Sequence, residues 1–146
     1  MKRVVVTGMA LASPLGCSVD EAFLRLQKYE NCVEYDPALE EYENLNSKLC
    51  TKVQGFETPE HFTRKVLRTM GRVSVLSVAT AEQALEQAGL LNDEIISNGQ
   101  TGVSYGSASG SLDSIIDFYS MEIEKKLRSV NSGSYIKMMP QTTTVN

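Results

Sequence analysis

The sequence Thr-Gly-Val-Ser-Tyr-Gly-Ser-Ala-Ser-Gly-Ser-Leu at residues 101–112 gives the strongest indication of the fold. Residues 102–105 predict a short strand, and residues 106–111 form a turn that contains only glycine and small side chains. The apolar positions of a helix follow directly, at Leu112, Ile115, Ile116, Tyr119 and Ile123. Open α/β sheets place their ligands where a strand leads through such a turn into a helix.

The turn matches neither the common phosphate-binding motifs nor a nucleophile motif. A dinucleotide fingerprint needs G-x-G-x-x-G and a phosphate loop ends in Gly-Lys-Ser/Thr, whereas this turn has neither spacing and no lysine. A hydrolase nucleophile elbow needs G-x-S-x-G, and Ser107 and Ser109 lie one place away from its serine. Two interpretations stay open from these residues: a tight, buried βα turn, or the wall of a ligand pocket.

Length and composition are those of one soluble globular domain. The chain has 146 residues, of which 42% are hydrophobic and 22% charged. A net charge of −4 argues against nucleic-acid binding as the main function. The sequence has no apolar run long enough for a membrane span and no signal-peptide pattern at its start, so we expect a cytoplasmic protein.

The cysteines and the histidine exclude several kinds of site. Cys17, Cys32 and Cys50 are odd in number and include no C-x-x-C pair, which argues against zinc, thioredoxin-type chemistry and a disulfide framework. His61 is the only histidine, so any Ser-His, Cys-His or multi-histidine site would have to use it. We expect His61 to be structural or on the surface, and we expect no metal and no cofactor.

The start of the chain predicts a strand, a loop and an amphipathic helix. Residues 3–7 are a β-branched apolar run typical of a strand buried on both faces. Ser18 and Glu21 have the spacing of a capping box that begins a helix. The expected core stripe of that helix is Val19, Ala22, Phe23 and Leu26.

Residues 30–57 show little periodicity and predict a surface insertion with solvated carboxylates and a short strand at 49–53. Residues 63–89 predict one long helix that is apolar nearly all round from residue 73 and is therefore buried. Its first turns carry Arg64, Lys65 and Arg68, which are either a solvated face or a docking patch for an acidic partner.

The last part of the chain predicts a helix over residues 112–128, a loop, an extended segment at 135–139 and a new helix from Pro140. That last helix would stop at Asn146 after little more than one turn, which is too short for a stable helix end. We therefore expect the chain to be a truncated piece of a longer protein.

Four segments together resemble the amino-terminal half of the β-ketoacyl-[acyl-carrier-protein] synthases, in the thiolase-like superfamily. They are Arg-Val-Val-Val-Thr-Gly-Met-Ala-Leu-Ala-Ser-Pro-Leu-Gly at 3–16, Phe-Thr-Arg-Lys-Val-Leu-Arg-Thr-Met at 62–70 with the helix to Gly89-Leu90, the turn at 101–112, and Met-Pro-Gln-Thr-Thr-Thr-Val-Asn at 139–146. The segments follow the family's order and span nearly the whole chain. The resemblance implies an α/β fold: an incomplete half of a layered α/β/α structure, with a mixed sheet and a buried central helix, over residues 1–146.

The resemblance also implies decarboxylative Claisen condensation of acyl and malonyl thioesters in fatty acid biosynthesis, without a cofactor. In the family, a cysteine accepts the acyl group from acyl carrier protein and two histidines promote decarboxylation and attack. These residues lie beyond Asn146 in the family pattern, and neither His61 nor any of the cysteines occupies a matching position. The chain alone is therefore expected to be catalytically inert, and the complete enzyme to be a homodimer.

Two sets of site residues follow from the resemblance. Arg64, Lys65 and Arg68 match the basic helix start that contacts acyl carrier protein, although Thr69 stands where a second cation is common. The acyl-pocket residues are Gly106, Ser107 and Ser109, and a serine at 109 replaces the larger apolar residue that often gates the pocket. The family's preference for a particular acyl chain length therefore does not carry over to this sequence.

Two other functions remain as alternatives to a condensing enzyme. One is a non-catalytic subunit of the same fold that binds acyl carrier protein, which the absence of the nucleophile leaves open. The other is an unrelated ligand-binding α/β module, against which the missing phosphate motifs argue.

Overall fold

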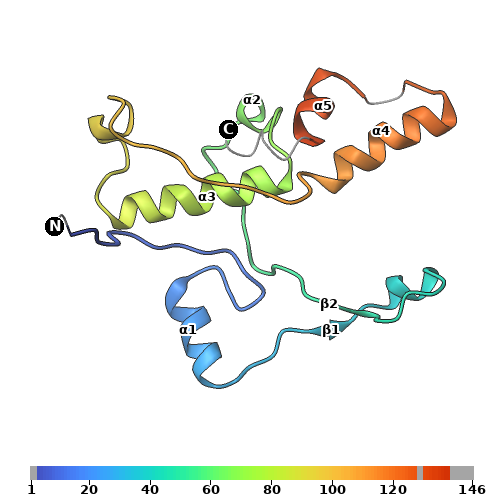
Figure 1. Ribbon diagram of the computed structural model, residues 1–146, viewed down its shortest axis with the longest axis horizontal. Helices are drawn as coiled ribbons and strands as arrows, with labels where there is room; N and C mark the ends of the chain where they lie inside the picture. Colours follow the sequence, from blue (N-terminus) through green and yellow to red (C-terminus); the bar gives the residue numbers. More distant parts are fainter. Residues whose placement is uncertain (1–2, 128–129, 139–146) are drawn as a thin grey trace. The chain divides into compact units, whose positions relative to one another are not determined.

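The computed structural model describes residues 3–127 and 130–138. The chain divides into two compact units (Figure 1), a smaller one, Met9–Glu57, and a larger one, made of Met1–Gly8 and Thr58–Asn146.

The smaller unit begins with α1 (Val19–Gln27). The Ser18 side chain accepts a hydrogen bond from the Glu21 backbone N–H at 3.2 Å, which confirms the predicted helix start. Gly16 has φ +138°, a backbone conformation that residues with a Cβ rarely adopt, so this position favours glycine. Of the predicted core stripe only Ala22 is buried, and the expectation was wrong for Phe23 and Leu26, which are more than half exposed.

A short hairpin and one 3₁₀ helix complete the smaller unit. β1 (Glu34–Tyr35) pairs antiparallel with β2 (Leu49–Cys50), and η1 (Pro37–Glu41) lies between them. The predicted strand at 49–53 forms only in its first two residues. Lys52 Nζ lies 2.7 Å from Asp36 Oδ2 and ties the two sides of the hairpin together. The assignment of residues 30–57 as a surface insertion stays a prediction.

The predicted single helix over residues 63–89 is wrong, because the chain breaks into α2 (Arg64–Leu67) and α3 (Arg72–Gln87). Gly71 is the N-cap of α3 with an extended backbone. α3 buries Ser74, Ser77 and Ala79, and its remaining apolar side chains are half-buried or exposed.

The strands expected at residues 3–7 and 102–105 do not form in the described part of the chain. Both segments are extended and exposed, with Val4 at 95% and Val103 at 73% of full accessibility. A strand needs a neighbour to accept its backbone hydrogen bonds, and no described segment pairs with either of them. The two-stranded sheet is therefore smaller than the predicted mixed sheet. Gly8 nevertheless packs on α3, since a Cβ there would lie 2.0 Å from the Ala84 carbonyl oxygen.

The C-terminal part of the larger unit contains η2 (Glu94–Ile96), α4 (Leu112–Glu124) and α5 (Ser132–Met138). The predicted helix from Leu112 is confirmed, but it ends early because Lys125 adopts a left-handed conformation with φ 57°. The extended segment expected at 135–139 is wrong for residues 135–138, which are helical. Residue 139 and the helix expected from Pro140 lie outside the described residues.

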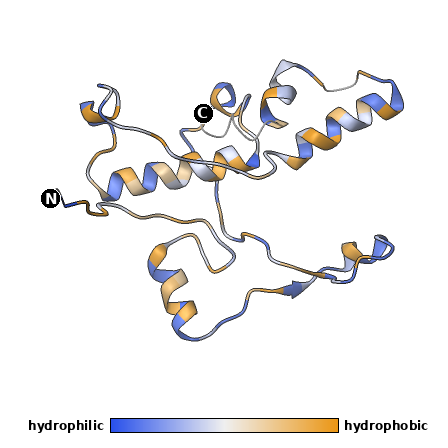
Figure 2. Ribbon diagram, viewed as in Figure 1, coloured by the Kyte–Doolittle hydropathy of each residue, from blue (hydrophilic) through white to orange (hydrophobic). Residues whose placement is uncertain are grey.

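One backbone hydrogen bond fixes the start of α4. The Ser111 backbone N–H donates to the Lys137 carbonyl at 3.3 Å, which joins the end of α5 to the start of α4. Apolar positions alternate with hydrophilic ones along α4 (Figure 2), and four of its apolar side chains are more than half exposed: Leu112, Ile116, Tyr119 and Ile123.

Candidate functional site

Two of the three predicted docking residues line one groove in the larger unit, of about 300 Å³. We call it the basic groove; its residues are Arg64, Leu67, Arg68, Asn131, Ser134 and Lys137. Lys65 lies on α2 as well, exposed, but outside this set. The structure therefore brings Arg64 and Arg68 together with Lys137, a cation that sequence reasoning had not selected.

Local backbone contacts build the basic groove from two elements far apart in the sequence. α2 starts where the Leu67 N–H donates to the Thr63 carbonyl at 3.0 Å. On the other side, Asn131 Oδ1 accepts from the Gly133 N–H at 2.7 Å and caps the first turn of α5. A Cβ at Gly133 would lie 3.3 Å from the Arg68 carbonyl oxygen, so the small residue permits the close approach of α5.

In the described part of the chain, the cations of the basic groove lack an acidic partner. Within residues 3–127 and 130–138, none of Arg64, Arg68 and Lys137 forms an ion pair. The chain as a whole carries a net charge of −4, so this local excess of positive charge runs against its average. Cations that remain uncompensated around one groove favour an anionic ligand or an acidic partner surface.

Lys137 was missed because the segment around it gives little helical signal. Ser132, Gly133 and Ser134 have weak helix propensity, and the following residues suggested an extended segment. Only the helical conformation of α5 and its packing beside α2 bring this lysine to the groove.

The glycine-serine turn is closed by its own hydrogen bond. The Gly110 N–H donates to Ser107 Oγ at 3.2 Å, and Gly110 has φ 64°. Ser107 is half-buried, whereas Gly106 and Ser109 are exposed, and none of the three lines the basic groove. Their assignment to an acyl pocket stays a prediction.

The segment before the turn is held to α3 by a pair of hydroxyl groups. The Tyr105 hydroxyl is hydrogen-bonded to Ser77 Oγ, on the buried side of α3. This contact fixes where the turn begins relative to the long helix.

His61 lies at the surface, as expected. Its Nε2 is 3.0 Å from Glu82 Oε2, and its ring meets Phe62 edge-on at 4.8 Å between centroids. Among the described residues there is no group of three His, Cys, Asp or Glu side chains that could hold a metal ion. The described helices likewise include none long and apolar enough to cross a membrane.

The comparison of structures defines the class of protein. The chain is similar to the crystal structure of a β-ketoacyl synthase from Burkholderia phymatum, with a TM-score of 0.89 and 43% identity over 99% of this chain and 36% of that chain. The fold is therefore an incomplete thiolase-like α/β structure. Residues 1–145 match the family described as "Beta-ketoacyl synthase, N-terminal domain". The chain belongs to this family.

Curated relatives agree with this assignment. The chain is 32% identical to 3-oxoacyl-[acyl-carrier-protein] synthase 1 of Haemophilus influenzae over 76% of this chain and 27% of that protein. It is 31% identical to 3-oxoacyl-[acyl-carrier-protein] synthase 2 of Vibrio cholerae over 89% of this chain and 31% of that protein. The chain thus spans about a third of the length of the relatives it matches.

Proposed function

We propose that the chain is the amino-terminal portion of a 3-oxoacyl-[acyl-carrier-protein] synthase of fatty acid biosynthesis. The observation that carries this proposal is the family match over residues 1–145, together with relatives that bear this name. In the proposed reaction, an enzyme cysteine holds an acyl group as a thioester. A malonyl thioester loses CO₂, and the resulting carbanion attacks the acyl carbonyl, which forms a carbon–carbon bond and releases the cysteine thiolate.

A reaction that uses two histidines cannot be completed by these 146 residues alone. They include one histidine, which is paired with Glu82 at the surface. The cysteine nucleophile and the two histidines are therefore assigned to the remainder of the protein, and the role of this portion is to bind and to position.

The basic surface of Arg64, Lys65 and Arg68 is proposed to dock acyl carrier protein, an acidic partner. Support comes from Lys137 at the same groove and from the lack of an ion pair at Arg64 and Arg68 among the described residues. Opposite charges across such a surface steer association and fix orientation more than they add affinity. A carrier protein that lies against these cations would present its thioester to the remainder of the enzyme.

The acyl pocket is proposed to include Gly106, Ser107 and Ser109. The half-buried Ser107, hydrogen-bonded to the Gly110 N–H, supports a fixed turn rather than a mobile loop. With serine at 109, the side chain that would border the acyl group is small and polar. We further propose a cytoplasmic homodimer.

The experiment that tests the proposed function is a condensation assay with the complete protein. Purified acyl carrier protein loaded with acyl and malonyl groups should give 3-oxoacyl carrier protein and one equivalent of CO₂. Carrier-protein binding without CO₂ release would instead identify a non-catalytic subunit. Absence of both binding and condensation would overturn the proposal.

A further inference from the structure

The glycine-serine turn at residues 106–111 is held to α3 at both of its ends. At its start, the Tyr105 hydroxyl is hydrogen-bonded to Ser77 Oγ, and the segment before the turn runs beside α3 (Figure 1). At its end, a Cβ on Gly71 would lie 2.4 Å from the Cβ of Ser111, so these two residues approach each other closely. Gly71 is the N-cap of α3 and Ser77 lies in its second turn. The glycine-serine turn is therefore attached at two points to the beginning of the same helix.

The end of the turn is fixed by contacts that do not involve Tyr105. Ser111 keeps only 5% of its accessible surface, and its backbone N–H donates to the Lys137 carbonyl at 3.3 Å. Within the turn, Ser107 Oγ accepts a hydrogen bond from the Gly110 N–H at 3.2 Å. These contacts hold the last residues of the turn whatever side chain precedes it.

The start of the turn depends on the Tyr105 side chain. A Cβ on Gly102 or on Gly106 would meet no heavy atom within 4 Å, and Val103 is 73% exposed. In the described part of the chain this segment also has no strand partner. The backbone on either side of Tyr105 is thus loosely packed, and the tyrosine side chain ties this end of the turn to α3.

The neighbours of Ser77 determine which hydroxyl donates. Ser77 Oγ lies 2.6 Å from the Val73 carbonyl oxygen, which can only accept, so the single serine proton points to Val73. The Tyr105 O–H therefore donates to Ser77 Oγ. A phenylalanine at position 105 would keep the ring and lose this donor, while buried Ser77 would keep its bond to Val73. The tyrosine oxygen can thus be removed without leaving a buried hydroxyl unsatisfied.

From this geometry we propose that Tyr105 is a positioning residue that sets acyl-chain selectivity through its hydrogen bond to Ser77. The inference rests on the proposed acyl pocket, in which Ser107 and Ser109 border the acyl group. Ser109 lies between the two attachment points, at Tyr105 and Ser111, so its place relative to α3 is fixed while both hold. A turn attached only at its end adapts to acyl chains of different length, and the enzyme then discriminates less between them.

The test is condensation by the complete protein with acyl carrier proteins that bear saturated acyl groups from butyryl to palmitoyl. Tyr105→Phe should lower the ratio of kcat/KM between the best and the poorest acyl chain at least about threefold, the scale of one lost hydrogen bond. Tyr119→Phe makes the same change at an exposed position of α4 and is the matched control. In this control the ratio should stay unchanged.

Ser77→Ala removes the acceptor and should lower the ratio by a similar factor. Because both changes break one hydrogen bond, the double variant should be no less selective than either single variant. An unchanged ratio in Tyr105→Phe, or an equal loss of kcat/KM for every chain length, would overturn the inference. An unmodified protein that condenses none of the acyl groups would instead overturn the proposed function, and this inference with it.

Discussion

Gly71 and Ser111 approach each other so closely that a Cβ atom on Gly71 would lie 2.4 Å from the Cβ of Ser111. Ser111 ends the glycine-serine turn and is the N-cap of α4, and Gly71 is the N-cap of α3. This contact joins two helix starts that are forty residues apart, and it lies at the break between α2 and α3.

We predict that Gly71→Ala destabilises the complete protein by about 1–3 kcal/mol, because the added methyl group must displace Ser111. Chemical denaturation measures this change. Gly102→Ala is the matched control, since a Cβ at Gly102 would meet no atom within 4 Å. Equal stability of the two variants would show that the contact does not constrain the fold.

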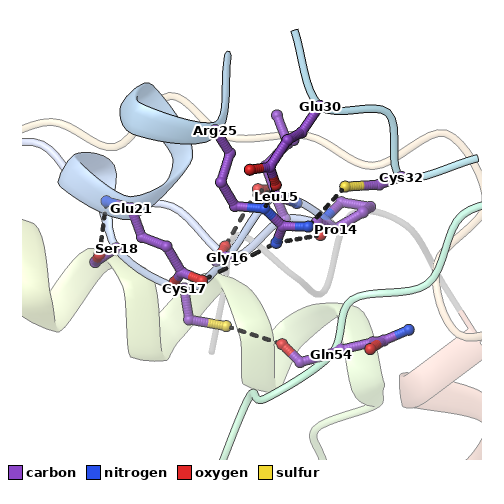
Figure 3. A network of polar contacts seen from close by, with 11 residues as sticks. Pro14, Leu15, Gly16, Cys17, Ser18, Glu21, Arg25, Glu30, Cys32 and Gln54 are labelled. Atoms are coloured by element: carbon purple, nitrogen blue, oxygen red, sulfur yellow. Dashed lines mark hydrogen bonds and ion pairs between the residues drawn. The ribbon is translucent and has the colours of Figure 1, made fainter. Parts of the chain in front are cut away.

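Ser18→Ala is predicted to cost about 1 kcal/mol, because the Glu21 N–H loses its side-chain acceptor at the start of α1 (Figure 3). Thermal or chemical denaturation again gives the value, and Ser18→Asp should restore most of the loss, because aspartate also accepts at an N-cap. If Ser18→Ala left the free energy of unfolding unchanged, water would replace the side-chain cap without cost.

The hairpin of the smaller unit should loosen in acid. A hydrogen bond from Lys52, followed by one from the Ala38 N–H, lowers the pKa of Asp36 below its ordinary value. The stabilisation from Asp36 is therefore present above the unfolded-state pKa and is lost as pH falls through the lowered, folded-state pKa.

NMR resonances of Glu34 and Cys50 in β1 and β2, followed against pH, measure this effect. Lys52→Met removes the main cause, so in this variant the transition should move to higher pH. A transition at the same pH in both proteins would be incompatible with the role of Lys52.

The sequence predicts the elements that depend on neighbouring residues and misses those that depend on distant ones. The start of α1 follows from Ser18 and Glu21, which lie one turn apart, and the start of α4 follows from its apolar spacing. The break between α2 and α3 lies at Gly71, and no local pattern encodes the close contact of Gly71 with Ser111. The strands expected at 3–7 and 102–105 need partner strands, and none of the described segments supplies one.

The candidate docking surface also combines residues that the sequence predicts with one that depends on distant contacts. Arg64 and Arg68 could be selected from the sequence because their segment resembles a family motif, and both line the basic groove. Lys137 could not, because its place depends on the helical conformation of α5 and on the close approach that Gly133 permits to Arg68.

If the basic groove is the docking site, salt should weaken the binding of acyl carrier protein. We predict that the affinity of the complete protein for acyl carrier protein falls as ionic strength rises. Salt screens the attraction between exposed charges, and the Debye length is about 10 Å in 0.1 M salt. Calorimetric titration at several salt concentrations measures the dependence. An affinity that does not change with salt would argue for an apolar interface.

The most direct measurement is the affinity of acyl carrier protein for an Arg68→Glu, Lys137→Glu variant of the complete protein, at low salt. Lys28→Glu, an exposed charge reversal in the smaller unit, is the matched control. The proposed docking role predicts that the double variant binds at least about tenfold more weakly than the unmodified protein while the control is unchanged. Equal affinity of the double variant and the unmodified protein would contradict it.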